Sequence, residues 1–294
     1  MSATDRDWKG LQRIKMFYRR HRIGRWLSFT VSLVCCAVLI APVFWMVRIS
    51  FTMREHMFVL PPPPLIQVAD LHGYAAIFQM HEFLRYYLNS IIVGAGTVLV
   101  SLVTGTLAAY SFSRFRYAAR RVLMLLALTA QMFPWVLLLI SIYLFFNRVG
   151  LLNTYQGLIF THTTFALPLT IWITKSYFDT IPREMEESAF IDGCGKMHVL
   201  SRILLPVSRP GITAAAIYVF IFSWNDFLFG LTLTSEDSMR ILAPGVALTF
   251  VAERKVLWGE MMASAVIVTL PLVILFLFLQ RHFIAGLTAG AVKE

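Results

Sequence analysis

Six long hydrophobic runs constrain this chain more than any other feature. The first, Trp26 to Val47, contains no charged residue, and the others are expected at 88–112, 122–146, 154–174, 211–233 and 261–279. A helix of about 20 apolar residues is long enough to cross the hydrocarbon core of a bilayer. We therefore predict an all-α, polytopic membrane protein with six transmembrane helices, not a soluble domain.

Basic residues are spread unevenly over the segments that join these runs. The chain holds 26 Lys and Arg against 16 Asp and Glu, a net charge of +10. If the N-terminus lies inside the cell, the inner segments hold 19 of the 26 basic residues, as the positive-inside rule requires. Both termini are therefore expected in the cytoplasm. This distribution explains the charge through membrane topology and contact with anionic lipid, so no nucleic-acid partner is expected.

Three regions are expected along the chain. They are a basic cytoplasmic arm over residues 1–25, a transmembrane domain over 26–283 and a cytoplasmic tail over 284–294. The run after the arm is too long for the core of a signal peptide and is interpreted as an uncleaved anchor. Pro61 to Pro64 predicts a stiff spacer, and Thr234 to Glu260 is expected to be a long outer loop.

A polar segment over residues 175–210 separates the fourth and fifth runs. Pro182 suits the first position of a helix, and three glutamates follow where the helix dipole favours negative charge. Gly193 interrupts the pattern, and a second short helix is predicted to end at Pro206. The segment is therefore predicted to be a helix, a glycine turn and a second helix.

This polar segment resembles the "EAA" loop of the membrane subunits of ATP-driven ABC importers. That loop has a Glu-Ala-Ala triplet, a Gly and an Ile-x-Leu-Pro sequence at fixed spacing. Ser188 replaces the first Ala, and both residues are small. The residues assigned to ATPase coupling through this resemblance are Glu187, Ser188, Ala189, Asp192, Gly193, Ile203, Leu205 and Pro206. The alternative is an ordinary cytoplasmic loop with two amphipathic turns.

Further stretches look like the carbohydrate-uptake branch of these permeases, and most like the smaller permease subunit of maltose-type transporters. They include Tyr110 to Phe115, Met132-Phe133-Pro134, Trp224-Asn225-Asp226 and the terminal Gly286 to Lys293. The resemblance implies a bacterial-type cytoplasmic (inner) membrane protein that pairs with a second, homologous permease. It also implies two ATPase subunits that use ATP and Mg²⁺, and an extracytoplasmic solute-binding protein. In the family the loop glutamate pairs with a basic residue of the ATPase, a role that falls here on Glu187.

The sequence contains no motif that predicts an enzyme. It has no G-x-x-x-x-G-K-[ST] phosphate loop, HExxH, CxxC or nucleophile elbow, so no cofactor or metal is expected on this chain. ATP hydrolysis would have to come from separate subunits.

The candidates for the translocation path are polar and aromatic residues within the predicted spans: Gln131, Tyr218, Phe222, Asn225 and Asp226. Asp226 is the only Asp or Glu within a span, and intramembrane carboxylates are costly and usually functional. Its alternative role is a helix-packing hydrogen bond or a local break in the fifth span. For Gln131 the alternative role is an interhelical hydrogen bond. For the aromatic residues the alternative role is ordinary packing.

The substrate stays open at this stage. Neutral disaccharides, longer oligosaccharides, uronate oligomers of the alginate kind and glycerol-phosphate compounds are all compatible with the sequence. An ABC permease for a non-sugar solute is one alternative. A self-contained secondary transporter is another, but it would need ion-coupling residues and usually an internal repeat.

Overall fold

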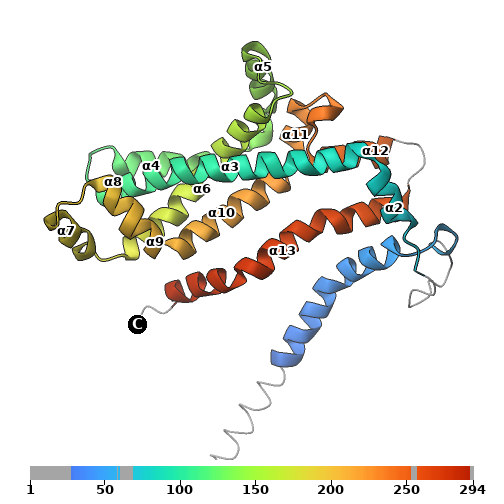
Figure 1. Ribbon diagram of the computed structural model, residues 1–294, viewed down its shortest axis with the longest axis horizontal. Helices are drawn as coiled ribbons and strands as arrows, with labels where there is room; N and C mark the ends of the chain where they lie inside the picture. Colours follow the sequence, from blue (N-terminus) through green and yellow to red (C-terminus); the bar gives the residue numbers. More distant parts are fainter. Residues whose placement is uncertain (1–27, 58, 60–68, 253–256, 292–294) are drawn as a thin grey trace, which may run out of the picture. The chain divides into compact units, whose positions relative to one another are not determined.

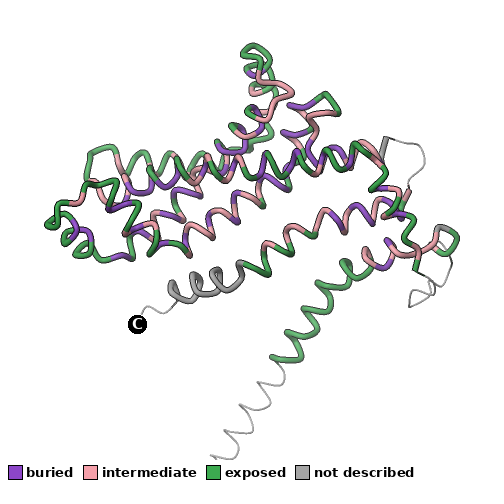
Figure 2. The backbone as a smooth tube through the Cα atoms, in the orientation of Figure 1, coloured by how far each residue is buried: buried purple, intermediate pink, exposed green. Residues whose placement is uncertain are grey.

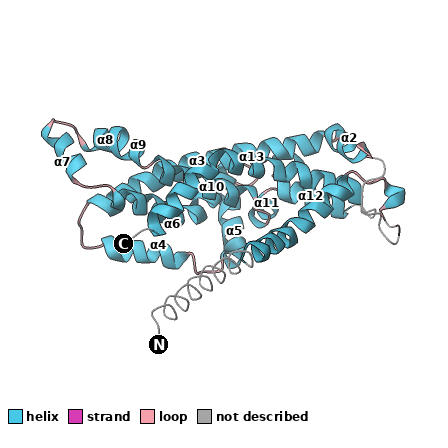
Figure 3. Ribbon diagram, turned by 90° about the horizontal axis from the view of Figure 1, so that it is seen from below, coloured by secondary structure: helices cyan, strands magenta, loops and turns pink. Residues whose placement is uncertain are grey.

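The computed structural model describes residues 28–57, 59, 69–252 and 257–291, and all its regular elements are helical within these ranges (Figure 3). The all-α prediction is therefore confirmed for this part of the chain. The basic arm and the run Pro61 to Pro64 lie outside the described residues. Contacts divide the chain into two units, Met1–Leu71 and His72–Glu294, which are described separately.

The first unit contains one long helix, Ser28–Ser50, followed by a 3-10 turn at Arg54–His56. The helix has 23 residues, and none of those in its most apolar stretch is buried (Figure 2). Exposed apolar side chains such as Phe29 and Leu39 suit a helix that faces lipid. This helix coincides with the first predicted span.

The second unit contains the helices labelled in Figure 1. They are α2 (His72–Gln79), α3 (His81–Arg114), α4 (Arg120–Ala130), α5 (Leu139–Val149), α6 (Tyr155–Thr180), α7 (Glu184–Ile191), α8 (Lys196–Val199), α9 (Leu205–Val207), α10 (Arg209–Trp224), α11 (Leu228–Leu233), α12 (Leu242–Ala252) and α13 (Trp258–Ala291). Two 3-10 turns, Trp135–Leu138 and Asp237–Met239, and a π-helical turn, Leu200–Leu204, complete it.

Three helices, α3, α6 and α10, pack against one another at the centre of this unit (Figure 1). Small residues allow the close approach: a Cβ on Gly105 would lie 2.7 Å from Cγ2 of Thr170, and one on Gly211 would lie 2.2 Å from the ring of Tyr177. Helices in lipid associate through such close packing, since lipid tails are as apolar as the side chains they would replace. The buried hydroxyl of Thr170 donates to the carbonyl of Ala166 in its own helix.

The segment expected as a long outer loop contains α12 and packs on its own domain. Leu242 and Phe250 are buried in one cluster with residues of α2, α3, α10 and α13. The side chain of Asn89 on α3 donates to the carbonyls of Ser238 and Arg240, at 3.0 and 2.8 Å. Residues 234–252 are therefore a packed part of the unit and not a free connector.

Two of the predicted spans are interrupted. The third, expected as one helix over 122–146, is divided into α4 and a second piece, Trp135–Val149, which are bent by 90°. Pro134 lies in this break. Proline interrupts a helix because it has no backbone N–H to donate and because it disfavours the helical conformation in the residue before it. The fifth, expected over 211–233, ends as α10 at Trp224 and resumes as α11.

Four described helices are long and apolar enough to cross a membrane, or up to six if each bent helix pair is one span. The number of six and the inside position of both termini stay predictions. Residues from 284, expected as a tail, continue the helical backbone of α13 to Ala291.

Candidate functional site

The first candidate site is the connecting segment, residues 181–208, which joins α6 to α10. Its helix α7 carries Glu184, Glu186 and Glu187 in the first turn. At its end the N–H of Cys194 donates to Ala189 O at 2.9 Å, and the N–H of Gly193 donates to Phe190 O at 3.1 Å. Gly193 has a φ of 83°, so this is a Schellman cap, in which glycine is favoured. The predicted glycine turn is confirmed.

The second half of the connecting segment is one helical stretch from Lys196 to Val207. It ends at Val207, so the predicted end at Pro206 is confirmed to within one residue. The N–H of Leu205 donates to the carbonyl of Leu200, five residues earlier, and this π-type turn changes the hydrogen-bond register just before the proline. At Ser208 the chain then bends by 81° into α10.

A buried ion pair fastens the connecting segment to the end of α3. Arg114 of α3 pairs with Glu186 of α7, and their side chains are only 9% and 6% exposed. Arg114 also donates to the carbonyl of Ile181 at 3.1 Å. On α6, Asp179 accepts a hydrogen bond of 2.6 Å from Ser113 of α3. The ends of α3 and α6 and the start of α7 therefore form one polar network.

The outer side of α7 combines two carboxylates, Glu184 and Glu187, with apolar side chains. Glu187 and Ser188 are exposed, whereas Ala189 is buried on the same side as Glu186. Ile191 is 87% exposed, and Met185, Phe190 and Met197 are also exposed. Exposed apolar groups clustered on a charged helix are typical of a protein-binding surface. We call Met185, Glu187, Phe190 and Ile191 the outer face of α7; Met197 belongs to α8.

The remaining predicted residues of the connecting segment lie along its second half or at the end of α7. Asp192 is the exposed C-cap of α7, Ile203 and Leu205 are half-buried, and Pro206 is exposed. The structure therefore brings the eight residues into one segment, but only some of them onto its surface.

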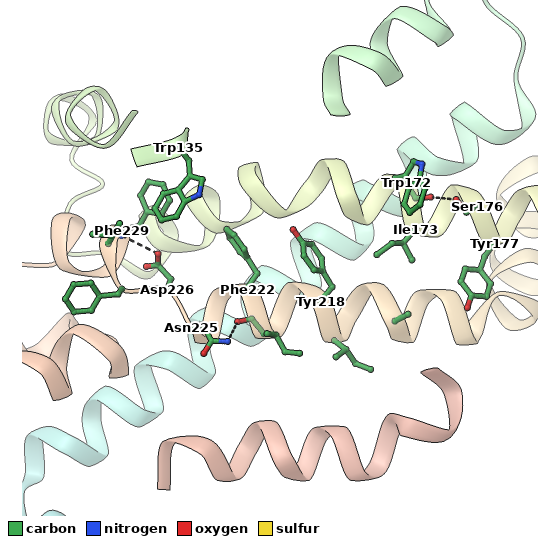
Figure 4. A pocket seen from close by; sticks show the side chains of 15 residues that line it. Trp135, Trp172, Ile173, Ser176, Tyr177, Tyr218, Phe222, Asn225, Asp226 and Phe229 are labelled. Carbon is green, nitrogen blue, oxygen red and sulfur yellow. Dashed lines mark hydrogen bonds between the residues drawn. The ribbon is translucent and has the colours of Figure 1, made fainter. Parts of the chain in front are cut away.

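The second candidate site is a groove of about 1260 Å³ along α6, α10 and α11 (Figure 4). Aromatic side chains dominate its lining: Trp135, Trp172, Tyr177, Tyr218, Phe222, Phe227 and Phe229. Asp226 is the one carboxylate among the lining residues, and none of these is Lys, Arg or His. The groove is therefore an apolar, aromatic surface with a small polar patch at Asn225 and Asp226.

Asp226 lies at the break between α10 and α11 and holds it in place. Its carboxylate accepts hydrogen bonds from the N–H groups of Gly230, at 2.8 Å, and Phe229, at 3.4 Å. These N–H groups lie in the first turn of α11, where the helix itself offers them no acceptor. Nε2 of His162 lies 3.2 Å from the same carboxylate, and Nδ1 of His162 lies 2.8 Å from the hydroxyl of Ser223. Asp226 thus lines the groove. It also stabilises a local break in the fifth span, which is the alternative role expected from the sequence.

His162, Ser223 and Asp226 match a hydrolytic trio in residue type, but all three are buried. His162 has no exposed surface, and both Ser223 and His162 are absent from the lining of the groove. No nucleophile of this trio therefore faces the cavity.

Four of the five residues predicted for the path, Tyr218, Phe222, Asn225 and Asp226, line the groove together. Gln131 does not line the groove. It caps the end of α4, and its side-chain amide donates to Phe165 O at 2.7 Å, which is the interhelical hydrogen bond given as its alternative role.

The sequence did not predict the roles of Arg114 and Glu186. The signal available for Glu186 was its i, i+3 spacing to Ala189, which places both on one side of a helix.

Known proteins resemble this chain both in family and in sequence. The model described as "binding-protein-dependent transport system inner membrane component" matches residues 101–288. The trehalose/maltose transport system permease protein of Thermococcus litoralis is 34% identical over 278 residues, covering 94% of this chain and 99% of the relative. The trehalose transport system permease protein of Mycobacterium tuberculosis is 33% identical over 274 residues, covering 92% and 98%.

A similar fold occurs in the crystal structure of a bacterial ABC transporter involved in the import of the acidic polysaccharide alginate. One of its chains matches with a TM-score of 0.79 at 19% identity, covering 90% of this chain and 98% of that one. A chain of the alginate transporter in complex with an alginate pentasaccharide-bound periplasmic protein matches with a TM-score of 0.61 at 13% identity, covering 86% of this chain and 95% of that one. At these identities the two matches show the fold alone.

Proposed function

This chain belongs to the family of binding-protein-dependent transport system inner membrane components, and we propose that it forms half of the translocation pathway of an ATP-driven importer for a neutral sugar or oligosaccharide. The observation that carries the proposal is the outer face of α7, which is exposed on a helix clamped to α3 by a buried ion pair. The groove along α6, α10 and α11 would receive the solute.

In this proposal the outer face of α7 docks onto a separate ATPase subunit. Phe190 and Ile191 would enter an apolar cleft, and Glu187 would pair with a basic residue beside it, as in the family. Two such ATPase subunits would bind ATP and Mg²⁺, since the sequence has no phosphate loop of its own. The positive-inside distribution supports an orientation with both termini and α7 in the cytoplasm.

Movement of α7 would reach the membrane by two routes. The Arg114–Glu186 pair transmits it to α3, and the helical stretch from Lys196 to Val207 transmits it to α10. Because both connections are short and well packed, the helices would move as rigid bodies. Such movement is the basis of alternating access between two permease subunits.

The groove is the proposed contribution of this subunit to the solute path, completed by a second, homologous permease. Aromatic rings can stack on the apolar faces of sugars, while Asn225 and Asp226 offer polar contacts to hydroxyl groups. The lining residues include no cation, so the groove favours a neutral sugar over a uronate or a phosphate ester. The names of the relatives, which include trehalose and maltose, support the same class. A solute-binding protein would deliver the sugar from the outer side.

Uptake into vesicles tests this proposal. The chain is co-expressed with its partner permease, ATPase subunits and binding protein, and labelled trehalose or an alginate oligomer is offered with ATP. Trehalose or a similar neutral sugar should enter in an ATP-dependent manner. Replacing Tyr218 by Ala should lower the uptake rate, whereas Tyr143→Ala, an exposed tyrosine of α5 outside the groove, should not. Uptake without the ATPase subunits would contradict the proposal, and selective uptake of the alginate oligomer would contradict the substrate class.

A further inference from the structure

A second cavity, of about 500 Å³, lies where the end of α3, the α3–α4 connection, the start of α4 and α6 meet. Four basic residues line it: Arg116, Arg120, Arg121 and Lys175. Its other walls are apolar or aromatic and include Phe112, Tyr117, Met124 and Leu125. The lining residues include no Asp or Glu, so the cavity is strongly cationic. We call it the basic pocket.

Most of the positive charge of the basic pocket is not neutralised by the protein. Lys175 pairs with Asp179 one turn along α6. Within the part of the chain that the structure describes, the guanidinium groups of Arg116, Arg120 and Arg121 make no hydrogen bond or ion pair. Cations held close together without a counter-charge repel one another and attract an anion. An anionic ligand would therefore be stabilised here.

The walls of the pocket also indicate a ligand with an apolar part. The apolar lining at Met124 and Leu125 continues into the exposed side chains of Val122, Leu123 and Leu126, and no residue of α4 is buried. Tyr117 is exposed beside the arginines, and aromatic residues are enriched at membrane interfaces. A free phosphate would contact only the cations, whereas a phospholipid would use both parts of the site.

We propose that the basic pocket binds the headgroup of an anionic glycerophospholipid of the inner leaflet, with the acyl chains lying along α4. The proposal rests on the membrane orientation given under the proposed function, which places the α3–α4 connection at the cytoplasmic surface. Basic pockets between helices on this side are suited to anionic headgroups. The lining residues Phe112 and Arg116 flank Arg114 in the sequence. The bound lipid would therefore stabilise the end of α3, where Arg114 holds the connecting segment.

Native mass spectrometry of the full chain in detergent tests the proposal. Phosphatidylglycerol and phosphatidylcholine with identical acyl chains are titrated separately, and retention of each lipid is measured. Wild-type protein should retain phosphatidylglycerol preferentially. The double variant Arg120→Gln/Arg121→Gln should retain it roughly 30-fold less well, because each basic residue near an anionic surface contributes to the attraction. The variant Arg120→Lys/Arg121→Lys keeps the charge and should retain most of the lipid.

The matched control is Arg148→Gln, which removes an exposed arginine from the last turn of α5, outside the pocket. Its lipid retention should equal that of wild-type protein. Equal retention of the two lipids, or equal retention of phosphatidylglycerol by the Gln double variant and the wild type, would overturn the proposal. So would displacement of the lipid by an equal concentration of glycerol 3-phosphate, since a soluble phosphate would then be the ligand.

The same variants are also co-expressed with the partner permease and the ATPase subunits, and co-purification of the ATPase subunits is measured. Loss of these subunits from the Gln double variant with unchanged lipid retention would assign the pocket to a protein partner and overturn the lipid site. If wild-type protein retains the lipid but never an ATPase, the proposed function fails while the lipid site stands.

Discussion

Two buried carboxylates, one in the connecting segment before α10 and one at the break after α10, are held in different ways. Glu186 of the connecting segment pairs with Arg114, whose guanidinium is always charged. Asp226, at the break after α10, accepts from two backbone N–H groups and contacts the ring of His162. The first arrangement joins two helices that are distant in sequence, and the second shapes a turn within one span.

The difference between these arrangements indicates different tasks for Glu186 and Asp226. Separating the buried pair would leave an uncompensated charge, at a large cost in free energy. A movement of α7 should therefore also move α3. A carboxylate that satisfies the first turn of α11 fixes where α10 ends and where Asn225 and Asp226 face the groove. Breaking the first should therefore affect coupling, and breaking the second should affect the solute path.

The largest effect is expected from breaking the Arg114–Glu186 pair. Replacing Glu186 by Ala leaves the Arg114 charge buried without its partner, which should lower the free energy of unfolding by about 3–5 kcal/mol. Unfolding in denaturant, followed in detergent, measures the loss. The double variant Arg114→Met/Glu186→Leu should recover much of the stability, but stimulation of ATP hydrolysis by the loaded binding protein should stay low. If single and double variants lose the same stability, the pair is not the clamp described here.

A smaller loss is expected at the break. Replacing Asp226 by Ala removes the acceptor for Gly230 N–H and the contact with His162, which should cost about 1–3 kcal/mol. The variant Asp226→Asn keeps one acceptor oxygen and should therefore lose less. The control is Asn225→Ala, since the exposed Asn225 side chain bonds only to Ile221 of its own helix. Equal unfolding midpoints for Asp226→Ala and Asn225→Ala would show that Asp226 does not hold the break.

Two glycines separate stability from coupling. Gly193 and Gly150 both have positive φ, 83° and 72°, and a Cβ on either would meet no atom within 4 Å. Alanine at either position should therefore cost a similar amount, about 1–2 kcal/mol, for its left-handed conformation. Only Gly193→Ala, next to the outer face of α7, should also reduce stimulated ATP hydrolysis. A matching reduction in Gly150→Ala would mean that stability alone explains the effect.

The smallest change in stability is expected at Glu187. This side chain is exposed and adjacent to the buried Glu186, so Glu187→Gln should alter the free energy of unfolding by no more than about 0.5 kcal/mol. Stimulated ATP hydrolysis should nevertheless fall, because the charge proposed to meet the ATPase is lost. Unchanged stimulation would restrict ATPase binding to the apolar residues of the outer face.

Hydrophobic runs were sufficient to predict the long helices of the second unit, but they missed α2 and α12 and could not predict where the helices break. Hydropathy measures transfer into lipid and is insensitive to backbone continuity, so Pro134 was placed within a single span although it lies in a 90° bend. Pro206 was correctly placed near the end of its helix, but no local pattern indicated the π-type turn that precedes it.

The candidate sites show the same limit. Spacing identified Glu187 and Gly193 within the connecting segment, and the conformation of Gly193 follows from the sequence. The burial of Glu186 depends on how α7 is rotated against α3, which only tertiary packing decides. Likewise, Tyr218 and Phe222 could be named from the sequence, but the groove they share with Trp172 requires α6 and α10 to lie side by side.

The most direct test of the account is co-purification of the ATPase subunits with an Ile191→Asp variant of this chain. Ile191 is 87% exposed, so the substitution should leave the fold intact while placing a charge in the proposed docking surface. The control is Val149→Asp, which makes a similar change at an exposed residue of α5. The account predicts that Ile191→Asp loses the ATPase subunits and keeps its partner permease, and that Val149→Asp keeps both. Full retention of the ATPase subunits by Ile191→Asp, with normal stimulation of ATP hydrolysis, would contradict it.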